Sequence, residues 1–525
     1  MSRPLPRIVA LTALVGLLCV TGPAGASVVT HMDLEALVRA SSVIVRGDVE
    51  SVESRLQNGR IHTEVTIRVD EGLKGAAGGG RVVLRQLGGS VGGYSKVVAG
   101  APTFQTGERV VVFAEPLKTG ALTVTGLFQG KYRIVDSGGQ PVVVRESAGQ
   151  DTRVVGGSGG SDAGQPLSEF LDRVRALVTQ YPGQGSSSSH SAAPDGDGGG
   201  RESAPFTLLG PGAWFEFDSG GAVPWRFSPT AAPAGVPGGA RAGYVSALSA
   251  WSNVPGTSVN LVDAGDTPPA CFDVIDGLNS IVHNDPCGEL PAYDPGTCSG
   301  VLAIGGFLAS LVTRTVNGVD FRQILEGDVT TNSGADCFWG GAGSYAEVIA
   351  HELGHALGLG HSCGGNTGIP CTDPVLDDAQ MRAFVHEDGR GASPRTDDIN
   401  AIHFIYAYAL AALNQASFST GQAMNVTVSG NLTALSDVYL VILLPDGSFF
   451  SFGPGFAISP PNILVPLATA LPALGSFGPV TLLTHTFGGG EPAGAYQWAF
   501  VIAPSGVSPL ASLIAVDLVG FTFTP

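Results

Sequence analysis

The chain has 525 residues, of which 44% are hydrophobic and only 14% are charged, and its formal net charge is −18. This length exceeds what one hydrophobic core serves, so two to four domains are expected. The acidic balance argues against nucleic acid as a partner, because contacts to phosphate require clustered lysine and arginine.

The first 26 residues have the pattern of an export signal. Arg3 and Arg7 precede an apolar stretch at 8–20, and small residues follow at 24–26. A membrane anchor is the alternative, but the stretch is shorter than the roughly 20 residues that span a bilayer. We expect cleavage near Ala26, release to the extracellular space or cell envelope, and no membrane span. No feature indicates an oligomeric state.

Residues 27–182 are predicted to form a β-rich domain. Val65, Ile67 and Val69 alternate with polar residues, as in a half-buried strand. The other expected strands are 43–49, 81–87, 109–113, 131–135 and 141–145, and a helix is expected at 166–181. This order predicts a small β-barrel or sandwich with a helix attached.

A glycine- and serine-rich segment, 183–205, is predicted to be a flexible linker. It precedes a domain of mixed helices and strands at 206–412. The expected strands there are 223–227, 280–283, 301–304 and 328–331, and the expected helices are 242–251, 344–357 and 397–408. Residues 413–525 are again β-rich, with strands at 426–428, 438–444 and 496–502, and predict a C-terminal β-sandwich.

Six cysteines remain after the export signal, and all lie in the central domain. An even number in an exported chain predicts three disulfides, with 15 possible pairings. A thiolate metal site is the alternative, but no C-x-x-C spacing occurs. Cys363–Cys371 is the pairing most readily expected, because it closes a short loop. The six are Cys271, Cys287, Cys298, Cys337, Cys363 and Cys371.

The segment 351–361 has the pattern H-E-x-x-H-x-x-G-x-x-H. His351 and His355 are four residues apart, so they lie on one face of the helix expected to start at Ser344. Gly358 lets the chain leave the helix and bring in His361 as a third ligand. Three neutral imidazoles leave one position open on a tetrahedral Zn²⁺ ion, as in catalytic zinc sites.

Glu352 lies beside the ligands, where it can act as the general base. The sequence thus predicts a secreted zinc-dependent endopeptidase, which hydrolyses peptide bonds with a zinc-bound water activated by Glu352. Its partner would be a protein or peptide substrate. The alternative is a non-enzymatic binding or surface protein that keeps the zinc site as a scaffold. Glu352 favours the enzyme, because a structural site needs no base.

The same segment resembles the metzincin zinc peptidases, and the matrixins in particular, with Ser362 after the third histidine. The resemblance implies a catalytic domain with a mixed sheet and a zinc helix, hence a multidomain α+β fold with flanking β domains. It also implies a methionine turn at Met381. An edge strand would receive the substrate as an added strand; its residues would be Val301, Leu302, Ala303 and Ile304.

Family members often carry structural Ca²⁺, for which Asp285, Glu289 and Asp294 are candidates; solvated loop carboxylates are the alternative. The sequence also departs from matrixins. No cysteine lies between Ala26 and Cys271, so a cysteine switch cannot keep the enzyme latent. Removal of residues 27–200 as a propeptide and their retention in the active enzyme are both open.

Overall fold

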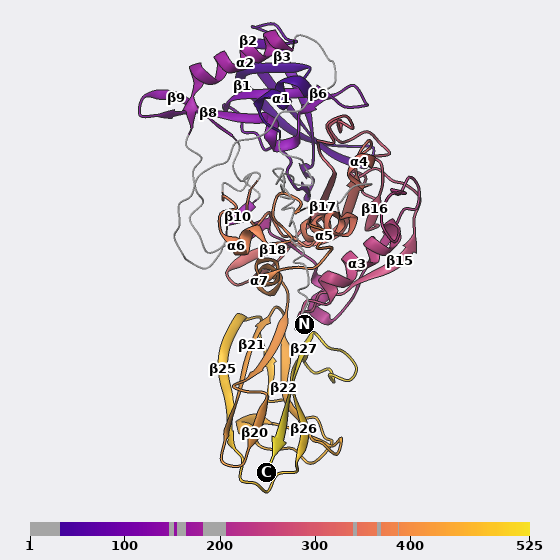
Figure 1. The fold of residues 1–525 in the computed structure, drawn as a ribbon, viewed down its shortest axis with the longest axis vertical. Helices are drawn as coiled ribbons and strands as arrows, with labels where there is room; N and C mark the ends of the chain where they lie inside the picture. Colours follow the sequence, from indigo (N-terminus) through magenta and orange to yellow (C-terminus); the bar gives the residue numbers. More distant parts are fainter. Residues whose placement is uncertain are drawn as a thin grey trace, which may run out of the picture.

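The computed structural model describes residues 32–145, 152–154, 164–181, 206–339, 344–364, 369–386 and 388–525. The predicted export signal and linker lie outside these residues. The described residues are rich in strands and form several sheets, which agrees with a multidomain α+β chain. Figure 1 shows three parts in succession along the long axis, with helix α5 in the middle part. No helix of the described residues is both long and apolar enough to cross a membrane.

The N-terminal part is a β-barrel with helices on one side. Strand β1 pairs with both β2 and β6, so the path β1-β2-β3-β7-β6 closes on itself, and β8, β9 and β11 continue from β6. The elements are α1 (Leu34–Ala40), β1 (Val43–Gln57), β2 (Arg60–Lys74), β3 (Arg81–Leu87), β6 (Arg109–Pro116), β7 (Leu122–Val124), β8 (Lys131–Ser137), β9 (Gln140–Arg145), β11 (Gln165–Pro166) and α2 (Leu167–Gln180).

Strand β6 shows how alternating side chains build this part. Val110 and Val112 belong to the barrel core, whereas Val111 and Phe113 pack in a second core with α1 and α2. Successive side chains of a strand point to opposite faces, so one apolar strand serves both cores. The predicted barrel or sandwich is therefore a barrel.

The central part contains a mixed sheet of order β15-β14-β16-β18-β17-β5-β4, with β13 beside β18. Strands β14, β15, β16 and β18 are parallel, and β17 is antiparallel to β18. The strands are β12 (Thr207–Leu209), β13 (Gly212–Ala213), β14 (Val223–Phe227), β15 (Leu261–Asp266), β16 (Ser280–Val282), β17 (Ala303–Val316) and β18 (Val319–Thr331). The helices are α3 (Ala240–Ser252), α4 (Asp336–Trp339), α5 (Tyr345–Ala356), α6 (Pro374–Asp377) and α7 (Thr396–Ile405). Strand β12 pairs with β10 (Thr152–Val154).

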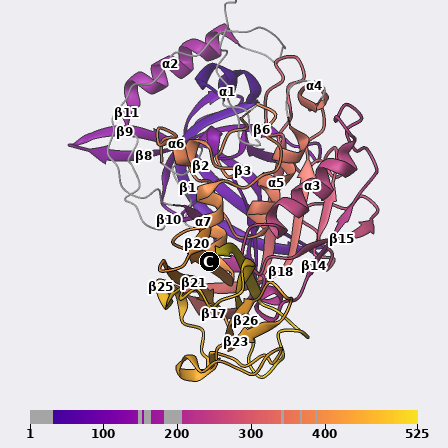
Figure 2. The same cartoon turned by 60° about the horizontal axis from the view of Figure 1, so that its bottom comes forward.

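Helices α3 and α5 lie side by side next to this sheet (Figure 2). Two buried tryptophans fix α5. The indole N–H of Trp251, on α3, donates to the carbonyl of Ala350 at 2.7 Å, and that of Trp214 donates to Ala356 at 2.9 Å. Both hydrogen bonds are buried, so α5 is held rigidly against its neighbours.

The predicted edge strand requires a correction. It was expected at 301–304, but β17 begins at Ala303 and continues to Val316. Its outer edge is also not free. Strands β4 (Gly89–Val91) and β5 (Tyr94–Val98) leave the N-terminal part and extend the central sheet, so that β5 pairs with β17.

The C-terminal part consists of two sheets, β19-β21-β25 and β20-β27-β26-β22-β23, with apolar side chains of both between them. Strand β19 pairs with β21 although it lies within the range predicted for the central domain. The strands are β19 (Tyr408–Leu413), β20 (Ser417–Ser419), β21 (Ala423–Leu432), β22 (Ser436–Leu443), β23 (Phe449–Ser451), β24 (Ala468–Leu471), β25 (Gly475–Thr486), β26 (Gly494–Pro504) and β27 (Ala515–Thr524).

Candidate metal centre

Helix α5 begins and ends where the motif predicts. Its N-cap is Ser344, whose hydroxyl accepts a hydrogen bond from the N–H of Glu347 at 3.2 Å. After its last turn, Gly358 adopts a φ of 95°, and a Cβ there would collide with the carbonyl oxygen of Gly212. Any other residue would be strained in both respects. Glycine thus allows the chain to turn back and bring His361 to the helix.

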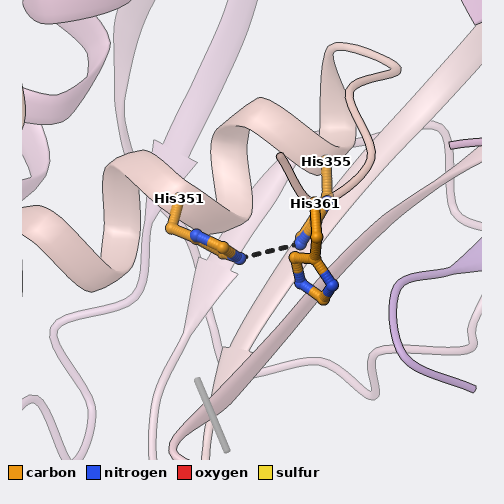
Figure 3. Close-up of side chains that lie close together, drawn as sticks. All are labelled: His351, His355 and His361. Atoms are coloured by element: carbon orange, nitrogen blue, oxygen red, sulfur yellow. Dashed lines mark hydrogen bonds between the residues drawn. The ribbon is translucent and has the colours of Figure 1, made fainter. Parts of the chain in front are cut away.

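The three histidines converge on one point (Figure 3). His351, His355 and His361 are all buried. The ring centroids of His351 and His355 lie 4.6 Å apart, those of His355 and His361 4.8 Å, and those of His351 and His361 5.2 Å. One ring nitrogen of each lies within 4.8 Å of the other two, so the group could hold a metal ion.

Backbone carbonyls orient two of these rings. The Nδ1 atom of His351 lies 2.9 Å from the oxygen of Gln380, and that of His355 lies 2.8 Å from the oxygen of Leu359. Because a carbonyl oxygen only accepts, each Nδ1 carries the hydrogen and each Nε2 presents a lone pair. The two Nε2 atoms are 2.9 Å apart. Two lone pairs at this distance repel each other, so this donor set fits a cation.

A proton is a poor candidate for that cation. Burial, together with the neighbouring His361, lowers the pKa of His351 to about 3. Burial also lowers the pKa of His355 well below its ordinary value. A metal ion that binds neutral imidazoles fits the donor set better, and three nitrogen ligands are typical of catalytic zinc.

Glu352 follows His351 in the chain, and its side chain lies against strand β17. A Cβ on Gly305 would collide with the Oε2 and carbonyl oxygens of Glu352, so β17 comes this close only because residue 305 is glycine. The Oε2 atom has no hydrogen-bond partner among the described residues. Burial raises the pKa of Glu352 well above its ordinary value, against the effect of the N–H of Gly305. The carboxyl group is thus buried against β17 without an ion pair to any described residue.

Met381 lies against α5 at Gly354, which is the residue before His355. A Cβ on Gly354 would collide with the sulfur of Met381. The turn is fixed by the carboxylate of Asp398, on α7, which accepts the N–H of Met381 at 2.9 Å and that of Gln380 at 2.7 Å. Met381 thus lies against the helix, and its role as a methionine turn stays a prediction.

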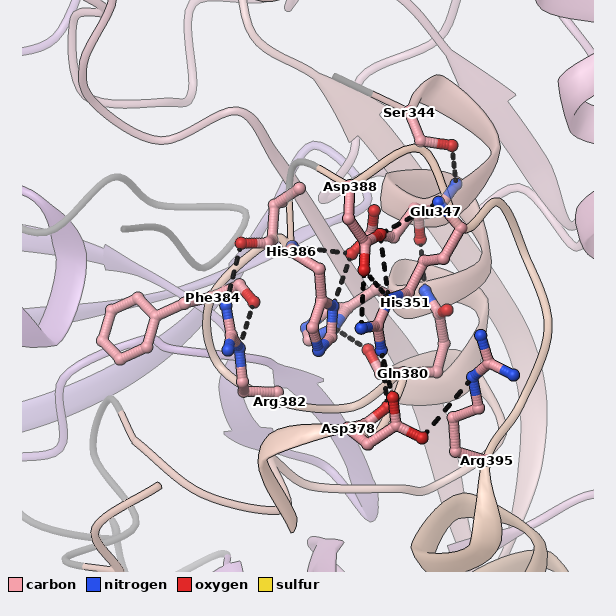
Figure 4. Close-up of polar contacts among 12 residues, drawn as sticks. Ser344, Glu347, His351, Asp378, Gln380, Arg382, Phe384, His386, Asp388 and Arg395 are labelled. Atoms are coloured by element: carbon pink, nitrogen blue, oxygen red, sulfur yellow. Dashed lines mark hydrogen bonds and ion pairs between the residues drawn. The ribbon is translucent and has the colours of Figure 1, made fainter. Parts of the chain in front are cut away.

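A polar network surrounds His351 and was not predicted (Figure 4). The carboxylate of Glu347 accepts hydrogen bonds from the backbone N–H of His386 at 2.9 Å and from its ring Nδ1 at 2.7 Å. The side-chain amide of Gln380 donates to the carbonyl of Glu347 at 2.6 Å. His386 is not among the described residues placed to share an ion. A small pocket beside His351 is lined by Val348 and Phe384, among others.

The six cysteines form three disulfides, as predicted, and Cys363–Cys371 is the pairing that was expected. The other two are Cys271–Cys287 and Cys298–Cys337. Cys271 and Cys287 also lie near Glu289, but the bond between their sulfurs leaves no thiolates for a metal.

The candidate calcium residues do not form one group. Asp285 accepts the N–H groups of Glu289 and Leu290, and Asp294 accepts the N–H of Gly296. No group of the described residues that could hold an ion includes Asp285 or Asp294. These two carboxylates stabilise turns of the loop.

The chain matches no protein-family model, and a search of curated proteins finds no similar sequence. Function is therefore inferred from the residues of the site alone.

Proposed function

We propose that the chain is a secreted zinc endopeptidase of the metzincin type. The observation that carries the proposal is the convergence of His351, His355 and His361 with an adjacent buried carboxyl group, that of Glu352. A structural zinc site has no use for such a carboxyl group. The three disulfides are consistent with an exported chain.

Each residue of the site has a distinct task. The three imidazoles would hold the zinc ion, and the carbonyls of Gln380 and Leu359 keep two of the rings in the tautomer that binds metal. When bound, zinc polarises the substrate carbonyl and lowers the pKa of a water ligand to about 7.

Glu352 would accept the proton of the attacking water and return it to the departing amine. Strand β17 would bind the extended substrate by its main chain, with Gly305 beside Glu352.

The test is proteolysis of unfolded casein. Because β5 covers part of β17, the assay uses the full chain and also its Val97→Pro variant, in which proline interrupts the pairing of β5. We expect the Val97→Pro variant to cleave casein; a zinc chelator should abolish this cleavage, and added zinc should restore it. Glu352→Gln should lower the rate by about 10²- to 10⁴-fold, the usual contribution of a general base.

The control is Glu169→Gln on an exposed site of α2, which should leave the rate unchanged. Equal cleavage by the Val97→Pro variant with and without Glu352→Gln would contradict the mechanism. Zinc binding without any proteolysis in either form would favour the non-enzymatic alternative.

A further inference from the structure

Strand β5 lies where an extended substrate is expected to bind. Its residues from Ser95 to Val98 pair antiparallel with β17 from Ala309 to Gly306. The N–H of the next residue, Ala99, donates to the carbonyl of Gly305 at 3.1 Å. Gly305 is the residue that lies against Glu352. The chain thus places one of its own strands along β17, leading toward the candidate catalytic base.

Lys96 is the one charged residue of β5, and it is buried. It lies opposite Leu308 on β17, and its ammonium group reaches beyond that strand to β18. There its Nζ lies 2.7 Å from Oδ2 of Asp328 and 3.8 Å from Oε1 of Glu326. Gly306 has no side chain to block this path. All three charged residues are at most 5% exposed.

Other groups of the central part hold both carboxylates in place. The hydroxyl of Ser280 donates to Asp328 at 3.0 Å. The N–H groups of Asp276 and Gly277 donate to Glu326 at 3.1 and 2.5 Å. The anionic site therefore belongs to the central part of the chain, and β5 supplies only the cation.

We propose that β5 holds the place of a substrate, and that Glu326 and Asp328 form a subsite that selects a lysine or arginine side chain of the substrate. This inference rests on the proposed function. A substrate strand that replaces β5 in the same register places every second side chain on the face of Lys96. Two buried carboxylates without a cation are costly, so a basic residue opposite Leu308 is favoured and an acidic one is excluded. While β5 is paired with β17, Lys96 fills the subsite and the edge of β17 cannot bind a substrate.

A binding measurement tests the subsite without catalysis. The full chain carries Glu352→Gln, to prevent cleavage, and either Val97→Pro or Lys96→Glu, to release β5. The first opening variant interrupts the strand pairing, and the second places a third carboxylate beside Glu326 and Asp328, so one can serve if the other fails to fold. Arg133→Glu, on an exposed residue, is the control for charge reversal.

The probe is a fluorescent peptide with the sequence of residues 94–101, Tyr-Ser-Lys-Val-Val-Ala-Gly-Ala. We expect it to bind the opened variants and not the control. Its Lys→Arg form should bind, whereas its Lys→Glu form should bind at least tenfold more weakly. Glu326→Gln with Asp328→Asn, added to an opened variant, should remove this difference. Equal binding of the lysine and glutamate peptides, or no binding to a folded opened variant, would overturn the proposal.

A cleavage assay, run beside the binding measurement, distinguishes failure of the proposed peptidase activity from failure of the proposed subsite. With Glu352 intact, the products of casein digestion should show basic residues enriched at one fixed position before the cleaved bond. Zinc-dependent cleavage without that enrichment contradicts the subsite and leaves the peptidase. Lysine-dependent binding without zinc-dependent cleavage contradicts the peptidase and leaves the subsite.

Discussion

The carboxylate of Asp398 controls the candidate centre although it touches no ligand side chain. It accepts the N–H groups of Gln380, Met381 and Arg395 at 2.7, 2.9 and 2.7 Å. The carbonyl of Gln380 in turn fixes the ring of His351. The chain of contacts runs from the first turn of α7, through the backbone of one turn, to a metal ligand.

Replacing Asp398 by alanine should therefore affect both stability and metal binding. Two buried N–H groups and a part-buried one lose their acceptor; the buried ones cost about 1–3 kcal/mol each, so the free energy of unfolding should fall by at least about 2 kcal/mol. Zinc affinity should fall about 10- to 100-fold, as for other groups that orient a ligand. Denaturant unfolding and chelator competition measure the two effects. Asp172→Ala, on an exposed side chain, is the control. Zinc affinity within twofold of the unsubstituted protein would contradict this role.

The sequence predicted the metal-binding side chains better than the residues that orient them. The spacing of His351, Glu352 and His355 within one helix is local information. Gln380 and Asp398 act through backbone atoms, and nothing in a residue's identity marks a carbonyl that will accept from a distant imidazole. The carboxylate of Glu347 binds His386, which lies in a different segment of the chain. That contact depends on the path of a loop about forty residues later.

At the scale of elements, the central helices were predicted well and the strands less well. The strand expected at 301–304 overlaps only the first two residues of β17, and the one expected at 328–331 is a short piece of β18. Both strands are longer because they pair as a hairpin, which alternation in a short window does not show. Strand β5 was missed. Glycines surround it, and its partner is about 210 residues away in the chain.

The disulfides provide a prediction at this scale. Loop closure in the unfolded chain makes a disulfide more stabilising when it joins residues farther apart in sequence. Cys298–Cys337 spans 39 residues and Cys363–Cys371 spans 8. Replacing the first pair by serine should thus lower the free energy of unfolding by about 1.4 kcal/mol more than replacing the second pair. Denaturant unfolding of the two double variants checks this order, and a larger loss for Cys363–Cys371 would contradict it.

At the scale of the whole molecule, buried polar contacts join the N-terminal and central parts. Arg60 of the barrel binds Asp273 and Glu289, and the carboxylate of Glu115 accepts the N–H of Ala292 at 3.1 Å. The order of β-rich, mixed and β-rich parts was evident from residue patterns. Their contacts were not, because each group finds its partner only after both parts have folded.

Glu115 makes this junction sensitive to pH. Burial raises the pKa of Glu115 to about 7, against the N–H of Ala292, which lowers it. A raised carboxyl pKa means that the folded state holds the proton more tightly than the unfolded chain. The protonated carboxyl group of Glu115 therefore contributes fully to the free energy of unfolding below about pH 4.5, and this contribution is lost as the pH rises through 7. From the shift of pKa, it amounts to about 3 kcal/mol.

Glu115→Gln should remove this dependence. We expect the loss of unfolding free energy between pH 5 and 7 to be smaller in the variant by about 2 kcal/mol. Glu53→Gln, on an exposed side chain, should keep the profile of the unsubstituted protein. Denaturant unfolding at several pH values measures both. A Glu115→Gln profile parallel to that of the unsubstituted protein would contradict the assignment.

The central claim is that three imidazoles share one zinc ion. Native mass spectrometry of the purified full chain, with and without added zinc, measures this most directly. We predict one zinc per chain, and none under the same conditions for His351→Ala, His355→Ala or His361→Ala, while His386→Ala and His403→Ala keep it. A chain that binds no zinc, or one that keeps its zinc after loss of any of the three histidines, would contradict the account.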